Sequence, residues 1–214
     1  MKRFFVLMLM MVATVAVAQP PYLFDANNEI GMFMVETPTA ESAQDDACYM
    51  GGPGQLTAYV VLTSPYSEFL GAPIDAVGGF EFRLEPGIAG LFVTPTIHPS
   101  ATNFMTPPDY FCGANVPVTG GQCTLITVTI GTFTTDPAPW FLTPISDAAA
   151  QSIPGGIAIT DANDAFRLQQ AYPTTGGGAD GMGAFDVPVF AMFDCADVVP
   201  SEDHTWGDVK TMFQ

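Results

Sequence analysis

Basic side chains are scarce in this chain of 214 residues, which has five Lys or Arg against 22 Asp or Glu and a formal net charge of −17. Two of the five, Lys2 and Arg3, lie at the N-terminus, so the 196 residues after position 18 carry a formal charge of −19. Phosphate backbones and anionic lipid repel such a body. We therefore expect no nucleic-acid binding and no peripheral membrane binding.

Long apolar runs are also absent beyond the N-terminus. There, Lys2 and Arg3 precede an apolar stretch from Phe4 to Val17, and Ala16-Val17-Ala18 ends it. A positive start, a short apolar core and an A-x-A exit are typical of a secretory signal peptide. The stretch is short for a membrane span, which disfavours an uncleaved anchor. We predict a signal peptide at 1–18, no membrane segment after its removal, and a secreted, cell-surface or periplasmic protein.

Cysteine is limited to four residues, and an exported chain favours their oxidation to two disulfides. Cys112 and Cys123 flank a turn-rich stretch, so we expect a local bond between them. Cys48 and Cys195 then join the early chain to the late chain. A metal site is the alternative, but no C-x-x-C occurs and neither His has ligand spacing from a Cys.

Recognisable catalytic motifs are missing. The chain has no G-x-S-x-G, and its two histidines, His98 and His204, have no recognisable base pattern around them. The 22 acidic residues offer no specific pair for glycoside hydrolysis. We therefore expect no enzyme, and a secreted hydrolase is the least favoured alternative.

Apolar residues make up 48% of the chain, which is enough to bury a core, and they alternate along several segments. Phe80, Phe82 and Leu84 alternate with charged residues, and Ile126 and Val128 alternate with threonines. A period of two predicts strands with one buried face. Together with the spacing of turn residues, it predicts an all-β, antiparallel β-sandwich, jelly-roll or immunoglobulin-like, with about eight or nine strands. We expect one domain over residues 19–200.

The C-terminal segment 201–214 is the exception. Thr205 and Asp208 fit a capping box, and Trp206, Val209 and Phe213 then fall on one helical face. We predict a short amphipathic helix or tail. It either docks on the sandwich or serves as a recognition or export tag.

Calcium is the most credible ligand among metals. Asp161, Asn163 and Asp164 present three oxygen side chains in four residues, and Asp180 comes from a later loop. Hard cations prefer carboxylate and carbonyl oxygens. The EF-hand pattern fails here, however, and Asx residues also form turns or caps without a metal.

Aromatic residues offer a candidate binding surface. Trp140 and Phe141 lie between prolines, and Tyr110 lies near Cys112. If exposed, these three rings stack on sugars or anchor a partner; if buried, they belong to the core.

The order of three strand segments, Gln55 to Thr63, Gly78 to Glu85 and Thr124 to Ile130, resembles that of cohesin-like β-sandwich domains, which share a jelly-roll fold with some carbohydrate-binding modules. The ending Thr205-Trp-Gly-Asp-Val-Lys-Thr-Met-Phe is similar to the tail of many exported bacterial proteins without an assigned activity. The resemblance implies the fold and a binding role. The resemblance does not assign a binding role to any individual residue of this chain, since no surface motif here matches that of a cohesin.

These observations predict an exported, non-catalytic β-sandwich that acts in surface adhesion or in assembly with another exported protein. A carbohydrate-binding module, calcium-stabilised or not, is the alternative. Its partner would be a polysaccharide.

Overall fold

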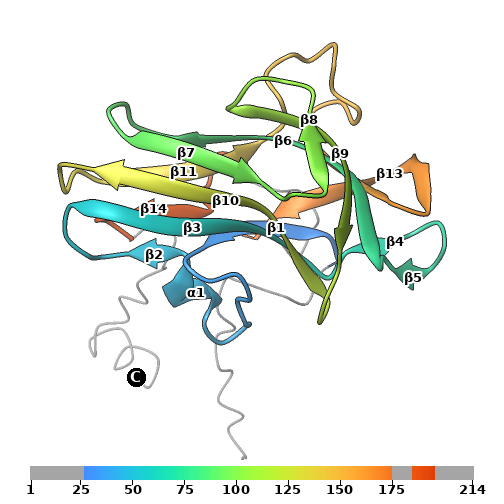
Figure 1. Cartoon of the computed structure of the whole chain (residues 1–214), viewed down its shortest axis with the longest axis horizontal. Coiled ribbons are helices and arrows are strands. Elements are labelled where there is room, and N and C mark those ends of the chain that lie inside the picture. Colours follow the sequence, from blue (N-terminus) through green and yellow to red (C-terminus); the bar gives the residue numbers. More distant parts are fainter. Residues whose placement is uncertain (1–26, 175–184, 196–214) are drawn as a thin grey trace, which may run out of the picture.

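The computed structural model describes residues 27–174 and 185–195, which adopt an all-β fold (Figure 1). Within them lie fourteen strands and one helix of four residues. In chain order the elements are β1 (Glu29–Phe33), α1 (Ala43–Asp46), β2 (Cys48–Tyr49), β3 (Gly54–Thr63), β4 (Tyr66–Ser67), β5 (Ala72–Pro73), β6 (Ala76–Pro86), β7 (Phe92–Ile97), β8 (Ala101–Asn103), β9 (Asp109–Pro117), β10 (Gln122–Thr132), β11 (Ala138–Thr143), β12 (Ile157–Asp161), β13 (Asp164–Pro173) and β14 (Phe190–Met192). Of these strands, β2, β4, β5, β8 and β14 have only two or three residues.

The first layer contains β7, β10, β3 and β1 in that order, and every pair in it is antiparallel. Its inner face follows the predicted alternation, because Ile126, Val128 and Ile130 of β10 are all fully buried. The matching positions of β3, from Leu56 to Leu62 in steps of two, are buried as well. The period of two therefore determines which side of this layer faces the core.

The second layer is organised around β6, the eleven-residue strand with the cleanest alternation. One edge of β6 pairs with β9, which in turn pairs with β8. The other edge pairs with β12 and, further along, with β11. Phe80, Phe82 and Leu84 turn inward from β6, and the rings of Phe82 and Tyr110 lie 5.5 Å apart.

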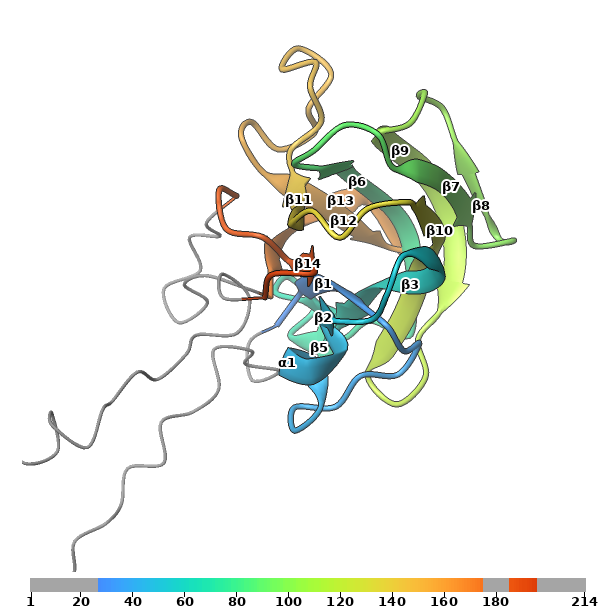
Figure 2. The ribbon, with the colours of Figure 1, turned by 90° about the vertical axis from the view of Figure 1, so that its left-hand side faces the viewer.

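One buried cluster fills the space between the layers and includes residues of β3 and β10 as well as β6, β9 and β11. Figure 2 shows the strands curving around this common interior. Each large apolar side chain that is fully buried here contributes about 1.5–3 kcal/mol.

Two parallel pairs correct the expectation of a purely antiparallel arrangement. Strand β1 pairs with β3 in the first layer and, in parallel, with β13 of the second, so that it joins the two layers. Strand β14 pairs in parallel with β2, which brings the late chain beside the early chain.

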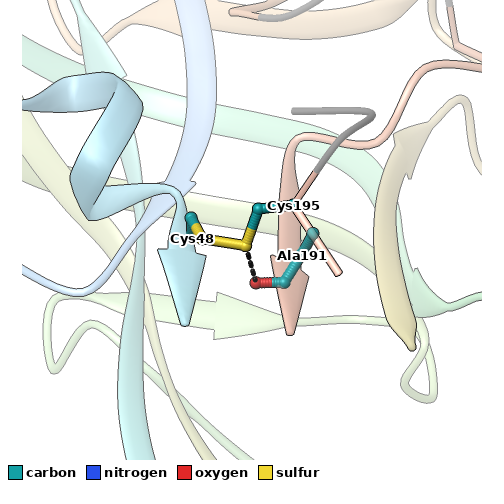
Figure 3. Close-up of a disulfide and its surroundings, with 3 residues drawn as sticks. All are labelled: Cys48, Ala191 and Cys195. Atoms are coloured by element: carbon teal, nitrogen blue, oxygen red, sulfur yellow. Dashed lines mark hydrogen bonds between the residues drawn. A yellow bond between two sulfur atoms is a disulfide. The ribbon is translucent and has the colours of Figure 1, made fainter. Parts of the chain in front are cut away.

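The predicted long-range disulfide between Cys48 and Cys195 is confirmed (Figure 3). It links residues 147 positions apart with a Cα–Cα distance of 5.7 Å. Cys48 begins β2 and Cys195 follows β14, and Ala191 donates its N–H to the carbonyl of Ala47 at 3.0 Å. The parallel pairing thus brings the two sulfur atoms together.

The predicted disulfide between Cys112 and Cys123 is wrong, because both thiols are free and buried. Cys112 lies on β9 in the second layer, whereas Cys123 lies on β10 in the first. The link from 118 to 121 joins a strand of one layer to a strand of the other instead of closing a hairpin between β9 and β10. Burial raises the pKa of each thiol to about 12.

The predicted signal peptide at 1–18 lies outside the described residues. So does the segment 201–214, with Trp206, Val209 and Phe213. Within the described part of the chain, no helix has the length and apolar character needed to cross a membrane.

We expect the Cys48→Ser/Cys195→Ser double variant to lose about 2–5 kcal/mol of unfolding free energy, because a crosslink across so long a loop strongly restricts the unfolded chain. Urea unfolding followed by tryptophan fluorescence measures the loss.

Treating the wild type with a reductant should reproduce this loss and should leave the double variant unchanged. A Cys112→Ala variant, which removes a free thiol, serves as the control that must respond to reductant as the wild type does. Equal stability of wild type and double variant contradicts the stabilising role of this bond.

Candidate functional site

The calcium candidates lie in a tight hairpin between β12 and β13. Asp161 accepts a hydrogen bond from the backbone N–H of Asn163 at 2.8 Å, and Asp164 forms an ion pair with Arg167 at 3.0 Å. The first contact is that of an Asx turn, the alternative that needs no metal. Asp180 lies outside the described residues. Across residues 27–174 and 185–195, no three metal-ligating side chains gather, so calcium binding stays a prediction.

Of the three aromatic residues considered as binding candidates, two belong to the core. Trp140 and Tyr110 are 0% and 2% exposed, and Phe141 is only half-buried. Trp140 takes an inward position of β11 between Ala138 and Leu142, so it belongs to the core. Burial therefore removes Trp140 and Tyr110 from any binding surface.

The charged groups of the second layer hold loops in place. Asp109 accepts hydrogen bonds from the Ser146 hydroxyl at 2.6 Å and the Ser146 N–H at 3.0 Å, and it forms an ion pair with Arg83 at 3.2 Å. Nearby, both carboxylate oxygens of buried Glu81 accept from the N–H of Ser152 at 3.0 and 3.1 Å. These carboxylates thus fasten the segment after β11 to β6 and β9.

Two opposing effects determine the pKa of Asp109. Burial alone raises it, but the bonds from Ser146 and the positive charge of Arg83 outweigh that effect and lower it. For Arg83, the hydrogen bond to Glu85 at 2.6 Å is the main cause of a raised pKa.

The first layer presents an outer face of a different kind. Strands β3, β7 and β10 contain no Asp, Glu, Lys or Arg, although the chain as a whole is strongly acidic. Their outward positions carry threonines, which we call the threonine face; its members are Thr57, Thr94, Thr96, Thr127 and Thr129. These strands run side by side in Figure 1. Their outer surface therefore offers hydroxyl and methyl groups without formal charge.

One end of the threonine face is hollowed beside two exposed aromatic rings. Phe92 and Phe133 are 66% and 82% exposed, and their ring centroids lie 5.6 Å apart at an interplanar angle of 82°. Together with Gln55, Thr94 and Thr129 they line a hollow of about 430 Å³, which we call the aromatic hollow. Gly131 lies opposite Phe92 in the register and leaves the floor open. Rings, hydroxyls and an amide thus converge in one uncharged place.

A second hollow of about 440 Å³ lies at the other end of the same two strands. Glu36, Thr96, His98, Thr124 and Thr127 line it, and we call it the histidine hollow. Nδ1 of His98 accepts a hydrogen bond from the N–H of Ser100 at 3.2 Å. In the neutral ring this bond leaves the proton on Nε2, which is then a donor.

A third hollow, of about 260 Å³, lies on the outside of the second layer. Phe104, Phe111 and Leu168 line it above a floor that includes Gly79 and Gly113. The three apolar side chains are 68%, 39% and 43% exposed. We call this the apolar hollow.

In the sequence, the threonines between Ile126, Val128 and Ile130 indicate a strand and no more. The signal that could have identified the threonine face is the lack of charged residues in β3, β7 and β10, three strands of a highly acidic chain. Phe92 and Phe133 carried no signal of their own, because aromatic residues are commonly buried and only the register places these two outside.

A scan against protein-family models finds no match to this chain, and a search of curated proteins finds none either. The functional argument therefore depends on the geometry of these surfaces.

We expect Asp109→Asn to lower the unfolding free energy by about 1.5–3 kcal/mol at pH 7, because it weakens hydrogen bonds made to a charged and largely buried group. The native pKa of Asp109 is lowered, so its ionised form contributes stability above the unfolded pKa of about 3.8, and this contribution is lost as the pH falls through the native value. The difference from wild type in urea unfolding should shrink towards pH 2.

Glu85→Gln is the matched control, since its carboxylate is 39% exposed and an exposed pair contributes at most about 1 kcal/mol. A gap between wild type and Asp109→Asn that stays constant from pH 7 to pH 2 argues against this assignment.

Proposed function

We propose that this protein is an exported, non-catalytic binding domain that acts in surface adhesion by holding a neutral carbohydrate at the aromatic hollow. The observation that carries the proposal is an uncharged hollow, lined by two exposed rings and by hydroxyl and amide groups, on a strongly acidic chain. Export is supported by the N-terminal signal pattern and by the Cys48–Cys195 bond, since disulfides persist in oxidising compartments.

Sugar rings have C–H faces and a rim of hydroxyls, so a site that binds them needs apolar stacking surfaces as well as hydrogen-bonding groups. Phe92 and Phe133 supply apolar faces for the ring. Gln55 both donates and accepts through its amide, and Thr94 and Thr129 do so through their hydroxyls. Such a combination of apolar lining and a few convergent polar groups is typical of small-molecule sites.

The electrostatics favour a neutral ligand. Within the described part of the chain the basic residues are Arg83 and Arg167, and each is already in an ion pair with an acidic side chain. An acidic polymer would also meet the negative charge of the whole chain. A cationic ligand would find no carboxylate on β3, β7 or β10.

A binding role without catalysis is consistent with the use of the carboxylates on the second layer. Glu81 and Asp109 accept hydrogen bonds that hold loops, and the aromatic hollow has no acidic lining residue. The jelly-roll type of sandwich, which cohesin-like and carbohydrate-binding domains share, fits this proposal.

Assembly with another exported protein is the second candidate function. The apolar hollow supports it, because exposed apolar clusters such as that of Phe104, Phe111 and Leu168 are typical of protein interfaces.

Phe92→Ala and Phe133→Ala should each weaken binding to neutral polysaccharides about tenfold, since each removes one stacking face worth about 1 kcal/mol or more. Depletion assays with insoluble cellulose, xylan, mannan and chitin, followed by calorimetry with soluble oligosaccharides, measure the loss.

Phe166→Ala is the matched control, because Phe166 is 99% exposed but lies on β13, away from the hollow. It should bind as the wild type does. Absence of binding to all four polysaccharides refutes the carbohydrate proposal, and an equal loss in Phe166→Ala refutes the site.

A further inference from the structure

We propose that the aromatic hollow and the histidine hollow are the two ends of one elongated site, which takes a neutral polysaccharide chain lying along β7 and β10. This inference rests on the proposed function and adds the shape, the direction and the chain length of the ligand.

The strand register places the two hollows next to each other along β7 and β10. Thr94 pairs with Thr129 and both line the aromatic hollow. Thr96 pairs with Thr127 and both line the histidine hollow. Residues two apart on a strand point to the same face and lie about 6.6–6.8 Å apart. The row of Thr94 and Thr129 in the aromatic hollow is therefore followed directly by the row of Thr96 and Thr127 in the histidine hollow.

The threonine face repeats its hydroxyl groups in rows. Neighbouring strands lie about 4.7–4.9 Å apart, so the partners in each row present their hydroxyls side by side. Thr57 of β3 extends the row of Thr129, since these two residues are also partners. A regular set of donors and acceptors suits a polymer that repeats its own hydroxyls.

The surroundings favour a ligand that runs along the strands. Across the strands, the row of Thr127 continues to Tyr59 of β3, which packs against an apolar cluster. The cluster includes Phe33, Val61 and Ala43 of α1. This apolar cluster therefore borders the threonine face on that side. Along the strands, the distance from Phe92 to His98 is about 20 Å at 3.3 Å per residue, which accommodates several sugar units.

The two ends have different chemistry. The aromatic hollow provides stacking through Phe92 and Phe133. The histidine hollow provides polar contacts instead: the Nε2–H of His98 donates, the hydroxyls of Thr96 and Thr124 donate and accept, and the carboxylate of Glu36 accepts. That carboxylate hydrogen-bonds sugar hydroxyls and repels an anionic chain. A chain that reaches both ends gains contacts that a short sugar at the rings cannot make.

The test is isothermal titration of the mature protein with a series from disaccharide to hexasaccharide. The series is made from whichever of the cello-, xylo-, manno- and chito-oligosaccharides binds best, with an oligogalacturonate series as the anionic comparison. We expect affinity to rise about tenfold or more from disaccharide to hexasaccharide. We expect the anionic series to bind more weakly throughout.

Variants separate the two ends. Thr96→Val/Thr127→Val keeps the branched shape but removes two hydroxyls of the histidine hollow, so it should weaken hexasaccharide binding about tenfold and leave the disaccharide unchanged. Phe92→Ala should weaken both. Thr102→Val, an exposed threonine of β8 in the other layer, is the control for the substitution itself, and melting temperatures establish that each variant is folded.

The outcomes distinguish the inference from the function on which it rests. Equal affinity for disaccharide and hexasaccharide, with no effect of Thr96→Val/Thr127→Val, overturns the elongated site and leaves the aromatic hollow as a sugar site. Tighter binding of the anionic series overturns the neutral ligand class. Absence of binding to every oligosaccharide overturns both proposals.

Discussion

The packing of two β-layers against one apolar core is the constraint on which the rest of this structure depends. A strand alternates its side chains, so burying Ile126, Val128 and Ile130 commits Thr127 and Thr129 to the outside. A slip of one residue in register would turn the threonines inward and leave the core without its apolar side chains. The threonine face is thus a direct consequence of core formation.

The two outer surfaces divide the chemistry of the molecule. The second layer carries Arg83, Glu85 and Asp109, which are joined in one network and hold the loop at Ser146. The first layer keeps charge away from β3, β7 and β10. In a chain with a formal charge of −17 this separation has a consequence for recognition, because it leaves one surface where a neutral ligand meets hydroxyls and rings.

Long-range connections hold the layers and the chain ends together. Strand β1 belongs to both layers through its pairings with β3 and β13. Strand β14 joins β2, and the Cys48–Cys195 bond covalently secures this pair, whose strands have only three and two residues. Strands this short form few ladder hydrogen bonds, so the crosslink adds to the stability that the buried side chains of β14 provide.

The sequence by itself determined the all-β class and the inward positions of β6 and β10, because alternation is a local property of the chain. The expected pair Cys48–Cys195 is confirmed, but the sequence reached it only by first pairing Cys112 with Cys123, which the structure overturns. The sequence did not reveal β9, which contains Gly113, or β13, where the apolar Phe166 and Leu168 are exposed while the polar Gln169 is buried. Only the tertiary structure decided that β9 and β10 lie in opposite layers, which leaves Cys112 and Cys123 unbonded, and that Trp140 is buried while Phe92 and Phe133 are exposed. The physical reason is that a period of two identifies the residues sharing one side of a strand, whereas the neighbours of that strand, and what covers each side, depend on contacts between distant segments.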